Sequence, residues 1–213
     1  QETKKFENIT KYESLGSFIT TELNKREIKE ATLFVNKDHL KEGQEAHIIF
    51  GANLNTYRFN KYFTDTDKKR MNFLNSVTVI SKSANNIKKL WGRFNALKEG
   101  VFLTRNLVSE PSNNLTPNLL AKEASNLKKV GLKINVLDEK KLKNLKMGAL
   151  LGVAQGSANK PFVVTLEWNG NPKSKVTDFS FVGKGVTFDT GGISIKPSGG
   201  MEEMKYDMGG SAV

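Results

Sequence analysis

The amino-acid sequence predicts an α/β fold, with an N-terminal mixed α/β domain over residues 1–84, a connecting helix over 85–108 and a further α/β part over 109–213. Composition separates the two ends of the chain: all five prolines lie in the last part, and eight of the 18 glycines lie within 183–210. Apolar patterns with the period of a helix alternate there with short strand-like runs. This alternation favours a mixed sheet covered by helices.

In the N-terminal part, three short runs rich in β-branched and aromatic residues predict strands. They are Ala31–Val35, Ala46–Phe50 and Ser76–Ile80. The segments Glu22–Glu30 and Asp65–Leu74, which flank or separate these runs, are typical of helical or loop structure. A mixed α/β domain without internal repeats follows from this order.

A stripe of apolar residues predicts the connecting helix, because its members recur at steps of three and four residues. We expect the helix to run from about Asn86 to Val108 and to end before Pro111, since proline disfavours helical geometry at the residue before it. Such a stripe is typical of core packing, so we expect this helix to pack between the two parts. Its members are Ile87, Leu90, Trp91, Phe94, Leu97 and Val101.

Capping residues mark the elements of the last part. Thr116 and Pro117 are typical of a helix start, and Gly131 is typical of its end. A strand is expected over 132–137, and Asp138 is placed to cap a short helix through residue 145. Two further strands are expected, at Pro161–Trp168 and Thr177–Val182.

The composition excludes several classes of protein and site. Hydrophobic residues make up 38% and charged residues 26% of the chain, as in a soluble globular protein. No uncharged apolar run approaches the roughly 18 residues of a membrane-spanning helix, and the polar start at Gln1 predicts no secretory leader. With no cysteine and only His39 and His47, any metal is expected on other oxygen or nitrogen ligands. We therefore expect a cytoplasmic protein whose ends are cut.

The net charge of +11 raises the question of a polyanion partner. Only five of the 33 basic residues are arginine, and the lysines are spread along the chain. Dispersed lysines are typical of solvated faces. A DNA-binding or structural role that uses this lysine-rich surface stays open as the alternative function, and a steep salt dependence of duplex binding would reveal it.

A glycine-dense loop over 183–197 follows the last predicted strand, at the end of a sheet where ligands usually bind. A phosphate-binding P-loop is excluded because Lys184 is followed by glycine rather than Ser or Thr. A dinucleotide fingerprint is excluded because Phe188 stands where its third glycine belongs. The loop presents instead a carboxylate, Asp189, between Lys184 and Lys196.

A second carboxylate, Asp207, stands just before another glycine pair. Asp189 and Asp207 are suited to a hard or borderline divalent cation, and a bridging carboxylate can hold two such cations about 3.5–4 Å apart. Ordinary turn capping by aspartate beside glycine is the alternative explanation. Spacing alone leaves both open.

Three stretches resemble the leucyl (cytosol) aminopeptidase family of dinuclear metallopeptidases. Residues 183–213 resemble its signature of a lysine, a T-F-D motif, paired glycines and a following D-M-G-G-S-A block. Residues 105–117 resemble its R-N-L entry motif, and residues 152–157 resemble a further G-V-A-Q-G-S block. Residues 1–100 agree only loosely, as the variable N-terminal domain of the family would.

The resemblance implies roles for four residues. Lys184 would be an amine ligand, Asp189 would bridge two metals and Asp207 would complete the more loosely held site. Lys196 would stay cationic, polarise the scissile carbonyl and stabilise the oxyanion. The resemblance further implies two divalent ions per complete subunit, Mn²⁺ or Zn²⁺, peptide substrates whose N-terminal residue, often leucine, is released, and a homo-hexamer.

The family also uses two carboxylates and an arginine from a D-x-E-G-R stretch, which no part of this sequence contains. We therefore expect residues 109–213 to be the N-terminal part of the metallopeptidase catalytic domain, in truncated form. The complete protein is expected to be an aminopeptidase, and the 213-residue chain alone is expected to be inactive.

Overall fold

The computed structural model describes residues 2–35, 40–41, 43–65, 73–174 and 176–213. The chain divides into two compact units, Gln1–Phe102 and Leu103–Val213, each of which combines helices with a small sheet. The predicted α/β class is confirmed, whereas the three-part division at residues 84 and 108 stays a prediction.

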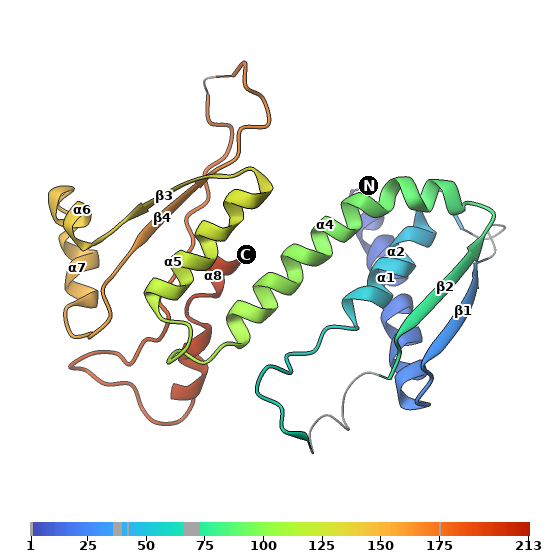
Figure 1. Ribbon diagram of the computed structural model, residues 1–213, viewed down its shortest axis with the longest axis horizontal. Helices are drawn as coiled ribbons and strands as arrows, with labels where there is room; N and C mark the ends of the chain where they lie inside the picture. The colour runs from blue at the N-terminus through green and yellow to red at the C-terminus, as the bar shows by residue number, and fades with distance from the viewer. Residues whose placement is uncertain (1, 36–39, 42, 66–72, 175) are drawn as a thin grey trace. The chain divides into compact units, whose positions relative to one another are not determined.

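The first unit is built around a parallel pair of strands joined through a helix (Figure 1). Strand β1, Glu30–Val35, pairs with β2, Ser76–Ser81, in a register that places Glu30 opposite Ser76. Helix α2, Gln44–Leu54, lies between them in the chain, as parallel pairing requires a crossover. The strands predicted at Ala31–Val35 and Ser76–Ile80 are confirmed.

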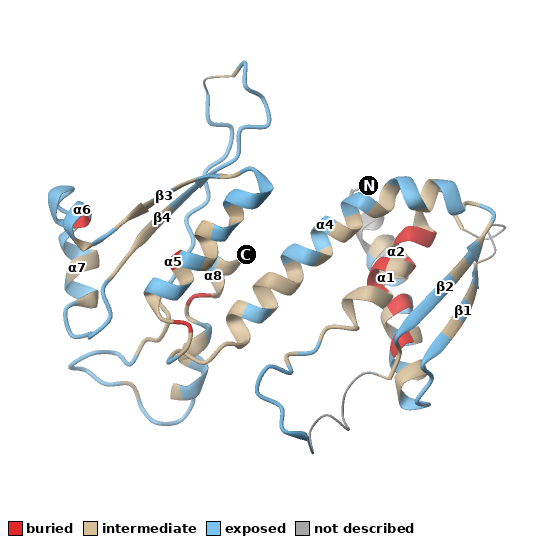
Figure 2. Cartoon of the chain, in the orientation of Figure 1, coloured by how far each residue is buried: buried red, intermediate tan, exposed pale blue. Residues whose placement is uncertain are grey.

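Helix α1, Glu2–Lys25, packs directly on α2. The two helices approach at Gly16 and Gly51, where an added Cβ would overlap the backbone of Ile48 or of Glu13, respectively. Figure 2 shows buried segments on both helices, and the buried side chains include Thr20, whose hydroxyl donates to a backbone oxygen of α2 at 3.0 Å. Close backbone contact therefore replaces large side chains at this crossing.

The strand predicted at Ala46–Phe50 is wrong, because these residues form the middle of α2. A short apolar run fits a buried helix as well as a strand, and here Gly43 turns the chain into the helix with φ 87°. Ala46 and Phe50, four residues apart, are both buried on one side of α2. Of the other segments in this unit, Asp65–Leu74 lies largely outside the described residues.

The helix predicted over 86–108 is observed as α4, Ala84–Ser109. Its residues are half-buried or exposed, and none is fully buried. Within the first unit, the Phe94 ring lies 4.9 Å from the His47 ring and 5.0 Å from the Phe50 ring, measured between centroids. The expectation that α4 packs between the two parts of the chain stays a prediction.

The second unit contains an antiparallel pair, β3, Lys133–Leu137, and β4, Val163–Glu167, in which Lys133 lies opposite Glu167. Helix α5, Pro117–Asn126, contacts both strands and continues into the 3₁₀ turn η2, Leu127–Val130. Two short helices lie between the strands in the chain. They are α6, Glu139–Asn144, and α7, Gly148–Ala154.

The capping predictions for this unit are confirmed. The Thr116 side chain accepts from the Leu119 amide at the start of α5, and Asp138 accepts from the Lys141 amide at 2.9 Å at the start of α6. Gly131 ends the first of these helical stretches with φ 95°, a left-handed conformation that favours glycine.

The strand predicted at Thr177–Val182 is not observed, since these residues form no regular element and pair with no described strand. Phe179, Phe181 and Val182 are 81%, 93% and 100% exposed. The residue types of this segment are typical of a strand. A strand forms, however, only where a neighbouring strand completes its backbone hydrogen bonds. Among the described residues of the second unit, strand pairing joins β3 and β4 only.

The described helices were also compared with the requirements of a bilayer span. None of them is both long enough and apolar enough to cross a membrane.

Candidate metal centre

Two glycine-rich segments of the second unit lie against each other. One is the loop over 183–197; the other contains the 3₁₀ turn η3, Met201–Tyr206, and the short helix α8, Gly209–Ala212. The Ser211 amide donates to the Lys184 carbonyl oxygen at 2.9 Å. A Cβ added to Gly183 would lie 2.5 Å from the Gly210 carbonyl oxygen, so the two backbones meet where neither carries a side chain. This contact brings Lys184 beside the residue that ends η3.

That residue is Asp207, and the Lys184 ammonium donates to its Oδ1 at 2.7 Å. The hydrogen bond from Lys184 to the Asp207 carboxylate raises the pKa of Lys184 above its usual range. The Asp207 side chain is 19% exposed, and its other oxygen, Oδ2, is buried without a hydrogen-bond partner in the part of the chain that the structure describes. A buried carboxylate oxygen without a donor is costly, so this atom is suited to a cation.

A second pair forms within the loop. The Lys196 Nζ lies 3.4 Å from Asp189 Oδ2, while the Gly191 amide donates to Asp189 Oδ1 at 2.9 Å. The hydrogen bond from Gly191 and the charges of Lys196 and Lys184 hold the pKa of Asp189 below its usual range. Asp189 is therefore ionised at neutral pH, and its Oδ2 faces the Lys196 ammonium.

The end of α4 supports the segment that carries Asp207. Met208 is fully buried, and a Cβ on Gly209 would lie 3.6 Å from the side chain of Val108. The Thr104 hydroxyl donates to the Ala212 carbonyl oxygen at 2.7 Å. These contacts hold the backbone that follows Asp207 against the last turns of α4, which contain the first residues of the 105–117 stretch.

The structure thus brings the four sequence-predicted residues together as two pairs, Lys184 with Asp207 and Asp189 with Lys196. Among the described residues, no three His, Asp or Glu side chains gather closely enough to form a metal site by themselves. The donor set of one amine and two carboxylates still fits a divalent cation of the manganese or zinc type, because Asp207 Oδ2 has no hydrogen-bond partner among the described residues.

The sequence analysis missed two hydrogen-bonding groups, each of which forms a bond between a side chain and the main chain. The Gly191 amide and the Thr104 hydroxyl both determine where the predicted residues lie. The left-handed conformation of Gly191 is compatible with the paired glycines of the motif, but its hydrogen bond to Asp189 depends on the loop geometry. The contact of Thr104 could not be predicted from the sequence, because a threonine inside a helix usually bonds within that helix.

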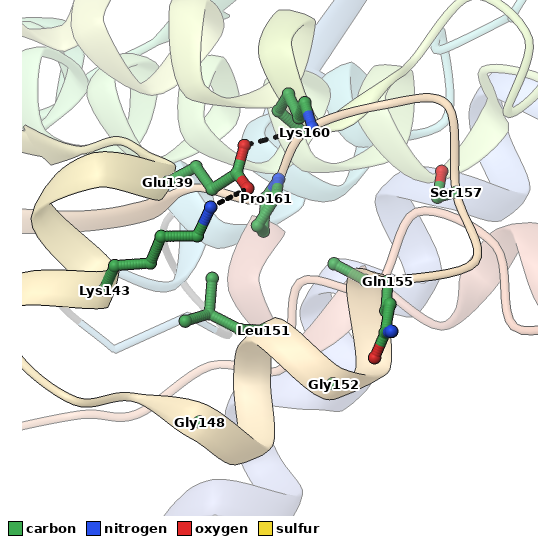
Figure 3. A pocket seen from close by; sticks show the side chains of 10 residues that line it. Glu139, Lys143, Gly148, Leu151, Gly152, Gln155, Ser157, Lys160 and Pro161 are labelled. Carbon is green, nitrogen blue, oxygen red and sulfur yellow. Dashed lines mark ion pairs between the residues drawn. The ribbon is translucent and has the colours of Figure 1, made fainter.

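A cavity of about 480 Å³ lies elsewhere in this unit, between α6, α7 and the loop that precedes β4 (Figure 3). Glu139 forms ion pairs there with Lys143 at 2.8 Å and with Lys160 at 3.1 Å. The G-V-A-Q-G-S stretch, 152–157, contributes several lining residues. None of the four candidate site residues lines this cavity, so it is a separate feature.

The second unit has the sequence of a peptidase catalytic domain. The family model described as the cytosol aminopeptidase family, catalytic domain, matches residues 102–213, which is more than half of the chain. The chain belongs to the cytosol aminopeptidase family.

Curated relatives agree with this membership. A probable cytosol aminopeptidase of Ehrlichia ruminantium (strain Gardel) is 45% identical over 202 residues, which cover 93% of this chain and 39% of the relative. A probable cytosol aminopeptidase of Wolbachia pipientis wMel is 42% identical over 208 residues, covering 96% of this chain and 40% of the relative. The chain therefore spans about two fifths of the length of these relatives.

Solved structures show the same similarity. The bottromycin maturation enzyme BotP in complex with Mn matches with a TM-score of 0.73 at 28% identity, covering 94% of this chain and 42% of that structure. A mutant of tomato leucine aminopeptidase matches with a TM-score of 0.72 at 28% identity, covering 95% and 40%, respectively.

Proposed function

We propose that the protein is a metal-dependent aminopeptidase that releases N-terminal amino acids, often leucine, from peptides. The observation that carries this proposal is Asp207 Oδ2, a buried carboxylate oxygen that has no hydrogen-bond partner in the described part of the chain and lies beside the Lys184 amine. Membership in the cytosol aminopeptidase family supports the class of reaction. A cytoplasmic location belongs to the same proposal, since relatives carry the name cytosol aminopeptidase. The homo-hexamer is part of it only through the family resemblance.

Lys184, Asp189 and Asp207 would hold the metal, with two divalent ions, Mn²⁺ or Zn²⁺, in the complete subunit. Such ions lower the pKa of bound water and polarise a carbonyl oxygen. Lys184 is protonated while it donates to Asp207, so its lone pair becomes available to a cation only when that proton leaves. Asp189 and Asp207 supply the negative charge that offsets the cations.

Lys196 has a different role in this proposal, although its ammonium pairs with Asp189 as that of Lys184 pairs with Asp207. We assign it to the substrate side of the site, where a fixed positive charge would stabilise the oxyanion that forms when water attacks the scissile carbonyl. The proton that this attack releases would go to solvent or to the departing amine. Lys196 would orient the carbonyl and keep its own proton throughout.

Calorimetric titration of Mn²⁺ into the 213-residue chain tests the ligand assignment. We expect one weakly bound ion in the unmodified chain and its loss in Asp207→Asn, which keeps the shape of the side chain but removes the charge. Asp178→Asn is the matched control, because Asp178 is an exposed carboxylate of the same unit. Equal Mn²⁺ binding by the Asp207 variant and the control, or no binding by the unmodified chain, would contradict the assignment.

A further inference from the structure

The loop from Asp189 to Lys196 closes on itself through backbone groups. The Gly191 amide donates to Asp189 Oδ1 at 2.9 Å, and the Lys196 amide donates to the Thr190 carbonyl oxygen at 2.9 Å. The Gly192 amide lies 3.4 Å from the Thr190 hydroxyl oxygen. The first two bonds fix both ends of the loop, one of which carries Asp189 and the other Lys196.

Gly191 stands at the tightest point of this loop. Its φ is +87°, and a Cβ added there would overlap the Ser194 carbonyl oxygen and lie 2.9 Å from the Lys196 amide nitrogen. Gly192 has a similar φ of +76°, but a Cβ added to it would have no atom within 4 Å. Both positions favour glycine for their conformation, whereas only Gly191 also requires it for space.

The hydrogen bond from Gly191 decides how Asp189 presents its carboxylate. One oxygen, Oδ1, is held by the loop backbone, and the other, Oδ2, faces Lys196 at 3.4 Å. Without that bond the side chain would be free to rotate, since the Asp189 side chain is about one third exposed. Gly191 therefore sets the direction of the carboxylate, and its lack of a Cβ leaves room for the Lys196 backbone, which the Thr190 carbonyl oxygen holds.

We propose that Gly191 is a positioning residue: it holds the Asp189 carboxylate and the Lys196 ammonium at a fixed separation, with Asp189 Oδ1 bound by the loop backbone and Oδ2 directed to Lys196. This inference rests on the proposed function, in which Asp189 is a metal ligand. Gly191 acts through Asp189 and Lys196 and touches neither metal nor substrate.

If Gly191 only stabilised the fold, its replacement would lower the thermal stability of the chain. The surroundings of the loop argue against such a role, because few apolar side chains are buried there. Ile193 is fully exposed and Ile195 is mostly exposed, so the loop contributes little buried apolar area to the unit. A change confined to this loop should therefore leave thermal unfolding close to that of the unmodified chain. Loss of metal affinity at unchanged thermal stability would separate positioning from stabilisation.

The test compares Gly191→Ala with Gly192→Ala in the 213-residue chain. Both variants place alanine at a positive φ, so their intrinsic backbone strain is matched. We expect Gly191→Ala to weaken Mn²⁺ binding on the order of tenfold, as loss of a group that orients a ligand does. Gly192→Ala is expected to bind Mn²⁺ nearly as the unmodified chain does, and both variants are expected to unfold at similar temperatures.

Amide proton shifts, recorded without metal, give the second readout. Gly191→Ala is expected to move the amide signals of Asp189 and Lys196, and Gly192→Ala is expected to leave them near their original positions. Equal Mn²⁺ affinities in the two variants, or unchanged amide signals in Gly191→Ala, would overturn the positioning role. Absence of Mn²⁺ binding in the unmodified chain would overturn the ligand assignment of the proposed function instead, while the amide signals would still decide the role of Gly191.

Discussion

Thr104 and Ala212 are joined by a 2.7 Å hydrogen bond from the threonine hydroxyl to the alanine carbonyl oxygen. The bond connects α4 to α8 across 108 positions of sequence. A threonine hydroxyl inside a helix commonly bonds within its own helix, so a partner so distant indicates a tertiary contact. The segment that follows Asp207 is thereby attached to a long helix.

Thr104→Val should remove this contact while keeping the volume of the side chain. We expect a loss of about 1 kcal/mol in the free energy of unfolding, because one partly buried hydrogen bond is lost and an acceptor is left without its donor. Thr104→Ser keeps the hydroxyl and should retain most of the stability. Urea unfolding of the three proteins measures this, and equal losses in the Val and Ser variants would show that the hydroxyl is not responsible.

Gly51→Ala should destabilise the first unit, because the added methyl group would overlap the backbone of Glu13 in α1. Overpacking at a helix crossing of this kind costs on the order of 2 kcal/mol. Gly92→Ala in α4 is the matched control, since a Cβ there has no atom within 4 Å. That control should gain up to about 1 kcal/mol from better helix propensity. Thermal unfolding that ranks the two variants in the opposite order would contradict the observed crossing.

Stability should depend on Glu139 in the acid range. The hydrogen bond from Lys143, followed by the one from Lys160, lowers the pKa of Glu139 below its usual range. A lowered pKa in the folded state means that this glutamate stabilises the fold above its unfolded pKa and stops doing so as the pH falls through its folded pKa. Glu139→Gln should therefore have a lower urea midpoint than the unmodified chain at neutral pH. The difference should shrink steadily on acidification, and a difference that stays constant with pH would exclude the ionic contribution.

Lys196→Ala in the complete subunit should lower kcat with metal content unchanged. The charge of Lys196 is assigned to the oxyanion, and removal of one oxyanion donor costs about 10²–10³-fold in rate. Steady-state hydrolysis of leucine amide, together with metal analysis of the same sample, measures both quantities. Loss of metal from the variant would show that Lys196 is a ligand or a structural residue.

The 213-residue chain by itself should hydrolyse leucine amide only at the background rate and bind one Mn²⁺ weakly, but not two. The three proposed ligands, Lys184, Asp189 and Asp207, are too few for two cations, which repel each other when insufficiently neutralised. The exposed side chains of Phe179 and Phe181 should also favour self-association. Two tightly bound ions per chain, or turnover comparable with that of an intact aminopeptidase, would contradict this prediction.

Local signals in the sequence predicted local structure well. Thr116, Gly131 and Asp138 act within one turn of the chain, and the structure confirms each cap. Ala46–Phe50 was assigned wrongly because a short apolar run takes its form from what it packs against, here α1. Thr177–Val182 has the composition of a strand, but pairing depends on a neighbour that sequence periodicity does not specify.

For the candidate site, the sequence indicated which residues take part but not how they contact each other. Residue type and family resemblance indicated Lys184 and Asp207, but their direct contact depends on the backbone approach of Gly183 to Gly210. The part played by Gly191 could not be predicted, because the donor is a main-chain amide that every non-proline residue carries.

The contact between Gly183 and Gly210 also limits how this site can be redesigned. A side chain at Gly183 would push the two segments apart. The distance between Lys184 and Asp207 would then increase as the two backbones separate. A randomised library at positions 183 and 210 should therefore return glycine at position 183 under selection for metal capture. Position 210, where an added Cβ would come no closer than 3.4 Å to the Lys184 amide nitrogen, should accept alanine or serine. Positions 183 and 210 face each other, but only position 210 would tolerate substitution.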